Sequence, residues 1–198
     1  MSISRTHVLV AAVATVLLAA GCSDDSTTTH TTEHSTTTTT GAAASTDFND
    51  ADVTFLQMMY PHHAQAVEMA KMVPSHTQNQ QLIALAAQVE QAQAPEMQQI
   101  TDLLTGFGKP APSATGHGGH DMPGMMTDAQ MSSLQAADGA DFDEQWLEMM
   151  IAHHEGAVGM AQTELNSGVN PASRALATKI IADQESEIAT MRGMLGQN

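Results

Sequence analysis

Basic residues are scarce in this chain of 198 residues: six lysines and arginines stand against 22 aspartates and glutamates, for a formal net charge of −16. A nucleic-acid partner requires a basic face, so this balance excludes one. The single cysteine excludes an internal disulfide and a cysteine-based zinc site. Four phenylalanines, one tryptophan and one tyrosine are too few for an all-β sandwich. What the chain has in excess is 15 methionines and 10 histidines.

The N-terminal segment has the pattern of a lipoprotein signal peptide. Arg5 precedes an apolar run over 8–20, which is too short to span a bilayer because spanning takes about 20 apolar residues. Leu18 and the small residues at 19–21 lead directly into Cys22, as in a bacterial lipobox. We therefore expect residues 1–21 to be removed, Cys22 to carry the lipid (palmitate among its acyl groups), and the protein to be anchored on the extracytoplasmic side of the cell membrane. The alternative is an ordinary secreted protein with a stray cysteine.

Residues 22–46 are mostly threonine, serine and small residues. Because they offer almost nothing apolar to bury, we expect a disordered tether between the lipid and the domain that follows. His30 and His34 lie in this tether, where we interpret them as solvated histidines, with weak metal capture as the alternative.

The remainder of the chain is internally duplicated. A shift of 91 residues aligns 52–104 with 143–195 without a gap. Phe55-Leu-Gln-Met-Met-Tyr-Pro-His-His63 then falls on Trp146-Leu-Glu-Met-Met-Ile-Ala-His-His154. Each copy has the pattern of two helices, which predicts an all-α, pseudo-twofold four-helix bundle built from a duplicated helical hairpin. The domain is expected over 47–198, as a first hairpin (47–105), a Met/His-rich linker with a short helix (106–139) and a second hairpin (140–198).

Helix start and stop signals set the expected ends of the long helices. Pro74 is expected to stop the first helix, and Gly168 to cap its counterpart in the second copy. Asn170 is the predicted N-cap of the last helix, with Pro171 in its first turn. Pro95 is expected to bend the second helix. The four long helices are predicted at about 50–73, 79–104, 141–167 and 170–195.

Two further local patterns concern helix starts. Thr127-Asp-Ala-Gln130 has the form of a capping box and predicts a short helix that ends near 138–139. Asp52 and Asp143 are expected in the first turns of their helices, where carboxylates suit the helix dipole.

The paired histidines lie on the face of each copy's first helix that is expected to point into the core. At 3.6 residues per turn, His62 and His63 fall within the apolar stripe, and so do their repeats. A buried imidazole needs partners for both nitrogens, and a metal ion uses its lone pair directly. A methionine stands one turn before each histidine. The candidate metal ligands are therefore His62, His63, His153, His154, Met58, Met59, Met149 and Met150. The alternative is that the histidines are satisfied core residues and the methionines pack the core; one shared site and two separate sites both stay open.

The second helix of each copy adds polar groups at matching positions. Gln93 and Glu96 repeat as Gln184 and Glu187, and the i to i+3 spacing puts each pair on one face. They are predicted to accept hydrogen bonds from imidazole N–H groups and so orient the metal ligands. The alternative is that they face solvent on an amphipathic helix.

The linker holds a second Met/His set on a glycine-rich backbone. His117, His120, Met122, Met125 and Met126 lie within ten residues, so this segment is a possible second metal site that wraps an ion without a preformed cavity. Thioethers favour Cu(I), while imidazole accepts either copper state or zinc. Copper with Cu(I) preferred, or silver as its analogue, is the predicted ion, and other metals stay open. The alternative is a Met-rich loop that packs over the end of the bundle.

The repeated Phe/Trp-Leu-x-Met-Met-x-x-His-His-x-x-Ala-Val-x-Met-Ala motif resembles the bacterial domain-of-unknown-function family 305, and Met122-Pro-Gly-Met-Met126 ahead of the second copy adds to the likeness. The resemblance covers about 48–197. It implies a ferritin-like four-helix architecture and exported copper-binding relatives linked to metal tolerance. Carried onto this chain, the family's Met and His positions are the eight candidate ligands given above. Pro61, where the second copy has Ala152, is expected to make the two halves unequal.

Three functions are weighed. The first is a membrane-anchored, extracytoplasmic protein that binds copper for sequestration or handover; its protein partner is unknown, and no catalytic residue is predicted. The second is a metal-free helical scaffold or interaction module. The third is a ferritin-like di-metal oxidase, which would use inward Glu-x-x-His pairs. Neither histidine helix has a glutamate three residues before a histidine, which argues against an enzyme.

Overall fold

The computed structural model describes residues 47–114 and 122–196. The predicted signal peptide, Cys22, the tether and the linker residues His117 and His120 lie outside the described residues. Within the part that is described, no helix is long and apolar enough to cross a membrane.

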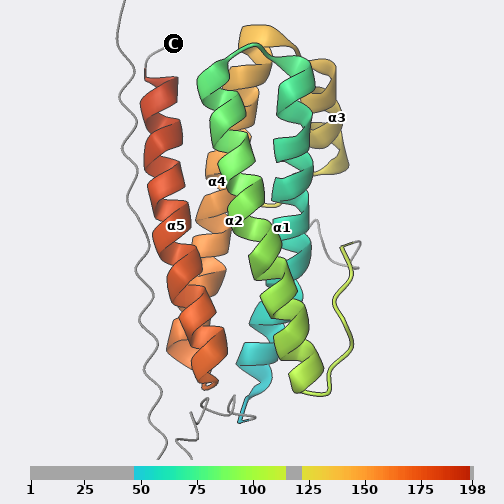
Figure 1. Cartoon of the computed structure of the whole chain (residues 1–198), viewed down its shortest axis with the longest axis vertical. Helices are drawn as coiled ribbons and strands as arrows, with labels where there is room; N and C mark the ends of the chain where they lie inside the picture. Colours follow the sequence, from blue (N-terminus) through green and yellow to red (C-terminus); the bar gives the residue numbers. More distant parts are fainter. Residues whose placement is uncertain (1–46, 115–121, 197–198) are drawn as a thin grey trace, which may run out of the picture. The chain divides into compact units, whose positions relative to one another are not determined.

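The described chain forms two helical hairpins and one short helix (Figure 1). The first hairpin consists of α1 (Asp50–His76) and α2 (Gln80–Gly106), and the second of α4 (Gly139–Ser167) and α5 (Pro171–Leu195). The hairpins join mainly through α1 against α4, while α2 and α5 touch only slightly. The short α3 (Asp128–Ala136) packs on α4. The predicted all-α four-helix bundle from a duplicated hairpin is confirmed.

Asparagine caps begin three of the four long helices, because a short side-chain oxygen accepts the free N–H groups of the first turn. Asn49 and Asp52 form a capping box at the start of α1. Asn79 caps α2, and Asn170 caps α5 with Pro171 in the first turn, as predicted. The predicted capping box at the start of α3 is also present.

Several predicted helix ends were wrong by a few residues. Pro74 does not stop α1, which continues to His76 and closes with the Thr77 N–H donating to the Val73 carbonyl at 3.2 Å. So close to the helix end, the N–H that proline lacks removes only one bond from the last turn. The short helix α3 ends at Ala136 and not near 138–139. Pro95, where a bend is expected, lies within the single helix α2.

The start of α4 also differs from the prediction. Since α4 begins at Gly139, Asp143 lies in its second turn and not in its first. There the carboxylate accepts a hydrogen bond from Asn79 Nδ2 at 2.8 Å, which links the two hairpins. Gly168 caps the end of α4 as predicted, through its N–H to the Glu164 carbonyl at 2.8 Å.

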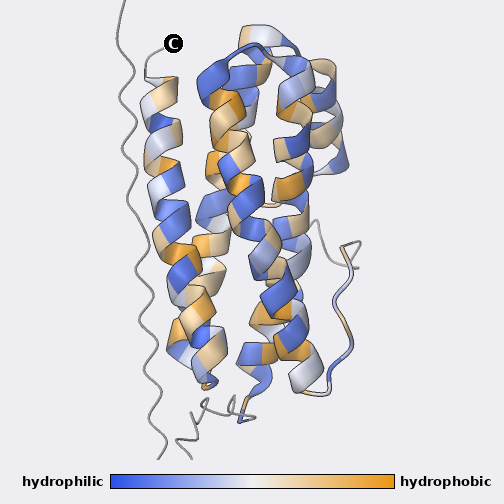
Figure 2. Ribbon diagram, viewed as in Figure 1, coloured by the Kyte–Doolittle hydropathy of each residue, from blue (hydrophilic) through white to orange (hydrophobic). Residues whose placement is uncertain are grey.

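The core consists of two apolar clusters with polar side chains between them. Both clusters draw residues from all four long helices, and Figure 2 shows apolar and polar residues alternating around each helix. The first cluster includes apolar residues within 66–73 of α1 and 142–150 of α4, and the second includes apolar residues within 53–59 of α1 and 157–161 of α4. We call the residues between them the polar layer. It consists of His62, His63, Gln93, Glu96, His153, His154, Gln184 and Glu187.

Candidate metal site

All four predicted histidines are fully buried at the contact between α1 and α4. The ring centroids of His62 and His153 are 3.8 Å apart, with an angle of 40° between the ring planes. The rings of His153 and His154 are 6.2 Å apart. The histidine pairs of the two copies therefore meet in one polar layer.

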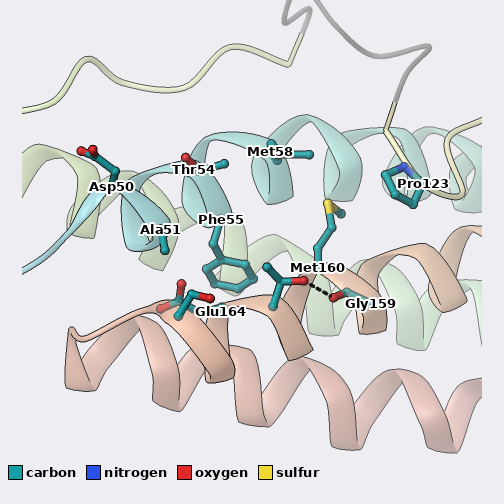
Figure 3. A pocket seen from close by; sticks show the side chains of 11 residues that line it. Asp50, Ala51, Thr54, Phe55, Met58, Pro123, Gly159, Met160 and Glu164 are labelled. Carbon is teal, nitrogen blue, oxygen red and sulfur yellow. Dashed lines mark hydrogen bonds between the residues drawn. The ribbon is translucent and has the colours of Figure 1, made fainter.

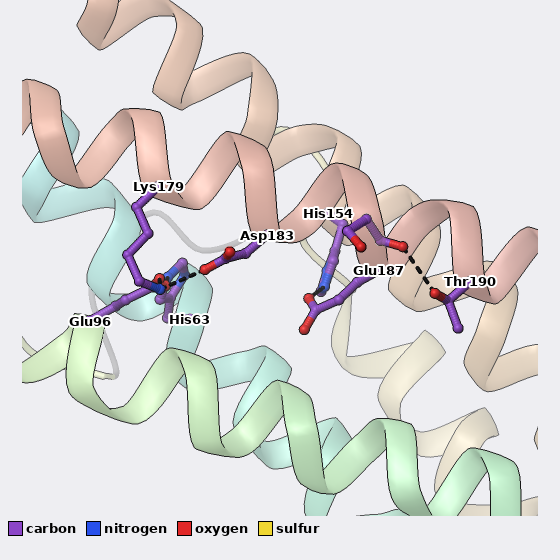
Figure 4. Close-up of polar contacts among 8 residues, drawn as sticks. His63, Glu96, His154, Lys179, Asp183, Glu187 and Thr190 are labelled. Atoms are coloured by element: carbon purple, nitrogen blue, oxygen red, sulfur yellow. Dashed lines mark hydrogen bonds and ion pairs between the residues drawn. The ribbon is translucent and has the colours of Figure 1, made fainter.

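Each copy supplies a carboxylate to one of its own histidines (Figure 4). His63 Nε2 donates to Glu96 Oε2 at 2.8 Å, and His154 Nε2 donates to Glu187 Oε2 at 2.7 Å. The two pairs are separated by the same 33 residues along the chain, so the duplication preserves the contact. Because an ionised carboxylate only accepts hydrogen bonds, it places the proton on Nε2 and leaves Nδ1 of a neutral ring with its lone pair.

A backbone carbonyl does the same for a third histidine. His62 Nε2 donates to the carbonyl oxygen of Pro123 at 3.0 Å. Among the described residues, the Nδ1 atoms of His62, His63 and His154 and both ring nitrogens of His153 have no hydrogen-bond partner. A buried polar atom without a partner costs about 1–3 kcal/mol. A metal ion bound to these lone pairs would supply the missing partner, so the residues fit such an ion.

Burial keeps the central pair of imidazoles neutral. Burial and, after it, the nearby His63 lower the pKa of His62 to about 3. Burial also lowers the pKa of His153 well below its usual value, and positive charge on His62 or His154 acts in the same direction. Near neutral pH both rings therefore hold a free lone pair, which is the form that binds metals.

The two glutamines of the polar layer behave differently from its glutamates. Gln93 and Gln184 are buried, with 1% and 2% of their surface exposed. Their amide groups contact no hydrogen-bond partner within the described residues, so neither orients an imidazole as the sequence predicted. Of the four predicted acceptors, Glu96 and Glu187 are the ones that contact histidine.

The two carboxylate–histidine pairs are not equivalent, because a lysine contacts one of them (Figure 4). Lys179 Nζ lies 2.7 Å from Glu96 Oε1, and it also pairs with Asp183. Burial alone would raise the pKa of Glu96, but its bonds to His63 and Lys179 hold that pKa below its usual value. Within the described residues Glu187 pairs with no lysine or arginine, so its charge is shared with His154 alone.

The predicted methionine ligands lie on both sides of the polar layer. Met59 is fully buried in the second apolar cluster, whereas Met149 and Met150 are buried in the first. Met58 is half-buried at the edge of the second cluster. No three His, Cys, Asp or Glu side chains of the described residues are arranged to hold one metal ion. An ion in the polar layer would therefore need thioether ligands in addition to imidazoles.

A short segment of the linker covers the histidines. We call residues 122–126 the strap. Gln65 holds it from α1, because its amide donates to the Met126 carbonyl at 2.8 Å and accepts from the Met126 N–H at 2.7 Å. Met126 is buried in the first apolar cluster, while Met122 and Met125 are half-buried. The strap lies against the middle of the bundle at the level of the histidines, and not over its end as one interpretation of the linker expected.

Two glycines allow the strap to lie directly on the helices. Gly124 has a φ of +79°, and a Cβ there would lie 2.5 Å from the Ala152 carbonyl oxygen. On α4, a Cβ at Gly156 would overlap the carbonyl of Pro123. Since that carbonyl accepts from His62, the close approach at Gly156 also sets the position of an acceptor in the polar layer.

A groove with a volume of about 660 Å³ lies beside the polar layer (Figure 3). Residues of α1 and α4 line it, with Pro123 of the strap at one end. Met58 and Met160 belong to its walls, as does Glu164. No sequence pattern singled out Met160 as a ligand, although the repeat aligns it with Met69 of the first copy. Likewise Gln65, Pro123 and Lys179 carried no sequence signal for their contacts.

Comparison with known proteins agrees with this fold. Residues 52–195 match the family described as domain of unknown function (DUF305). The solved structure of a DUF305 protein from Streptomyces coelicolor is 33% identical with a TM-score of 0.68, covering 74% of this chain and 93% of that one. A DUF305 fragment from Deinococcus radiodurans is 31% identical with a TM-score of 0.70, covering 76% and 98%.

A third similar structure contains a metal. CopM in its Cu(II)-bound form is 30% identical with a TM-score of 0.65, covering 74% of this chain and 96% of that one. CopM has also been solved in Cu(I)-bound and Ag-bound forms. A comparison with curated proteins gave no match. Because the family match spans both hairpins and the two DUF305 structures are covered almost completely, the chain belongs to the DUF305 family, as its repeated motif predicted.

Proposed function

We propose that this protein binds Cu(I), or Ag(I) as its chemical analogue, in the polar layer, and that it sequesters the ion or hands it to another carrier. The observation that carries the proposal is the set of buried, unpartnered Nδ1 atoms on four histidines of the described bundle. In three of these rings the Nε2 N–H already donates a hydrogen bond to an acceptor. The similarity to CopM, which has been solved with copper and with silver, supports the choice of ion.

The available donors favour a soft monovalent ion. Hard cations such as Mg²⁺ and Ca²⁺ bind through several oxygens. In the polar layer, Glu96 and Glu187 already accept from imidazoles, and Lys179 takes the other oxygen of Glu96. What is left is neutral imidazole nitrogen with thioether sulfur from Met59 and Met150 on either side. Sulfur and imidazole donors without a thiol suit Cu(I).

The linker is proposed as a second, weaker site. Its donors would be His117, His120, Met122, Met125 and Met126. Of these, Met126 packs into the bundle core, so it would have to leave that position to bind an ion exposed to solvent. The proposed location is the extracytoplasmic side of the membrane, with the lipid on Cys22 and residues 22–46 as the tether.

The two other functions have less support. A di-metal oxidase needs carboxylates free to bind metal, and the two glutamates of the polar layer are instead bound to histidine, one of them also to lysine. A metal-free scaffold would leave five imidazole nitrogens buried and unpaired at a cost of about 1–3 kcal/mol each. The metal-binding function accounts for both features.

The test uses the purified protein without residues 1–21 and with Cys22→Ser, which removes the thiol. A competitive titration against a colorimetric chelator measures its affinity for Cu(I). We expect His62→Ala/His153→Ala to weaken binding about 100-fold or more, because both rings supply ligands. The matched control is His76→Ala, which removes a half-buried histidine away from the polar layer.

The outcomes separate the candidate sites. Equal affinities for the parent chain and for His62→Ala/His153→Ala would overturn binding in the polar layer. Loss of binding only in His117→Ala/His120→Ala would place the site in the linker instead. The location is tested separately: mass spectrometry should find acyl chains on Cys22, and Cys22→Ser should move the protein from the membrane fraction to the soluble fraction.

A further inference from the structure

The groove between α1 and α4 is next to the polar layer but separate from it. Phe55, Met58 and Thr54 line it from α1, and Gly159 and Met160 from α4 (Figure 3). Its lining is mostly apolar, which does not suit a hydrated divalent cation. What distinguishes it from an ordinary packing defect is a thioether on each wall.

The two thioethers come from opposite hairpins. Met58 lies one helical turn before His62 on α1, and Met160 lies on α4 one turn after Gly156. Both side chains retain some exposure at the groove, Met160 about 8%. This contrasts with Met59 and Met150, which are completely buried. Thioether sulfur has little affinity for hard cations and binds Cu(I) and Ag(I).

The inner end of the groove leads to a histidine. Pro123 forms that end, and its carbonyl accepts the His62 Nε2 proton at 3.0 Å. His62 in turn lies against His153. Pro123 therefore both lines the groove and contacts one of the two central imidazoles.

An exposed carboxylate lies at the other end of the groove. It belongs to Asp50 in the first turn of α1, whereas the buried Glu164 on α4 keeps its proton because its pKa is raised to about 8. The chain as a whole carries a formal charge of −16. A cation approaching this end meets a favourable field before it reaches the sulfur atoms.

We propose that this groove is the loading site of the protein, where Cu(I) first binds between the thioethers of Met58 and Met160 before it moves under the strap to His62 and His153. This inference rests on the proposed function, because the groove loads the polar layer. The transfer exchanges thioether for imidazole ligands and leaves copper as Cu(I). If the imidazoles bind through Nδ1, the proton of His62 stays on Nε2 and its hydrogen bond to the Pro123 carbonyl is kept, so no proton or electron moves.

The first test separates rate from affinity. Stopped-flow mixing of the Cys22→Ser protein with a Cu(I)–chelator complex measures loading, and a competitive titration measures equilibrium binding. We expect Met160→Leu to slow loading about tenfold while the equilibrium affinity changes by less than about threefold. The matched control is Met131→Leu, which replaces a half-buried methionine of α3 away from the groove.

Each result of this test has a definite meaning. An unchanged loading rate in Met160→Leu would overturn the loading site. An equal fall in rate and affinity would also overturn it, because Met160 would then be a ligand of the final site. Failure of the proposed function looks different, because the parent chain and His62→Ala/His153→Ala would then bind Cu(I) with the same affinity.

The second test observes the groove directly. In protein labelled at the methionine methyl groups, Ag(I) is added to the His62→Ala/His153→Ala variant, whose central imidazoles are removed. We expect the methyl resonances of Met58 and Met160 to shift together at substoichiometric Ag(I). Shifts confined to other methionines would overturn the proposal, whereas a paired shift in the absence of the histidines supports a site that is separate from the polar layer.

Discussion

His62 and His153 lie against each other in the centre of the bundle with their ring centroids 3.8 Å apart, although they are 91 residues apart in the sequence. The Nε2 N–H of His62 donates to a backbone carbonyl, whereas His153 has no hydrogen-bond partner among the described residues. A contact of this kind is expensive in a core, and the proposed metal binding would offset its cost.

Replacing the unpartnered histidine should stabilise the metal-free protein. We expect His153→Leu to raise the free energy of unfolding by about 1–2 kcal/mol, because an apolar side chain of similar size removes two buried, unpaired nitrogens. The same variant should lose most of the stabilisation that Ag(I) gives the parent protein. Urea denaturation with and without Ag(I) measures both effects.

The control for this prediction is a histidine with partners. His76 donates to the Ala137 carbonyl at 2.9 Å and stacks on Phe142 at 4.8 Å. His76→Leu should therefore lower the free energy of unfolding and leave the gain from Ag(I) unchanged. Destabilisation by His153→Leu of the same size as that by His76→Leu would contradict the account.

Removing the carboxylate that holds His154 should weaken metal binding. Glu187 is the acceptor for His154 Nε2 at 2.7 Å, so without it the ring loses its fixed orientation and proton position. We expect Glu187→Leu to reduce Cu(I) affinity about 10–100-fold while the bundle stays folded. Glu185→Leu, two residues earlier on the exposed side of α5, is the control and should bind as the parent does. Equal affinities in both variants would show that Glu187 does not position a ligand.

Part of this arrangement could be predicted from the sequence. The 3.6-residue period places all four histidines inside, and the duplication brings them to equivalent positions. The i to i+3 spacing also put Glu96 and Glu187 each on one face with a glutamine, but it left open whether that face meets the histidines or solvent. These features depend on periodicity and symmetry, which survive in a single sequence.

Other contacts had no local signal. The hydrogen bond from His62 to Pro123 joins residues 61 apart, and the contact from Lys179 to Glu96 joins residues 83 apart. Lys179 aligns with Gln88 of the first copy, so the duplication gives no indication of its contact with Glu96. The strap's position depends on two close backbone approaches, at Gly124 and Gly156, which only the packed structure shows.

The packing of the strap predicts that alanine substitutions at two glycines of α4 have different effects on stability. A methyl group at Gly156 would overlap the Pro123 carbonyl, whereas nothing lies within 4 Å of a Cβ at Gly159. We expect Gly156→Ala to lower the free energy of unfolding by about 1–3 kcal/mol. Gly159→Ala should leave it unchanged or raise it by up to about 1 kcal/mol, since alanine favours a helix interior. Similar values for the two variants in urea denaturation would mean that the strap does not pack as described.

The carboxyl group of Glu164 should make the free energy of unfolding depend on pH. Burial, followed by the nearby Asp52 carboxylate, raises the pKa of Glu164 to about 8 from its usual value of 4.5. The folded state therefore keeps a proton that the unfolded chain loses. The resulting stability is fully present below about pH 4.5 and is lost as the pH rises through about 8.

Glu164→Gln should flatten this part of the stability profile. Its amide keeps a donor near Asp52 but has no proton to lose, so the decline in unfolding free energy between pH 5 and 8 should shrink by about 1–3 kcal/mol. Glu155→Gln is the control, because Glu155 is exposed and pairs with Arg192. A decline of the same size in parent and Glu164→Gln would rule out a raised pKa at this position.

The most direct test of the central claim is the imidazole ¹⁵N spectrum of the protein before and after one equivalent of Ag(I). We expect large shifts of Nδ1 on the polar-layer histidines, while Nε2 of His63 and His154 stays protonated and still donates to Glu96 and Glu187. Unchanged Nδ1 signals on His62, His63, His153 and His154, with shifts only at His117 and His120, would contradict it.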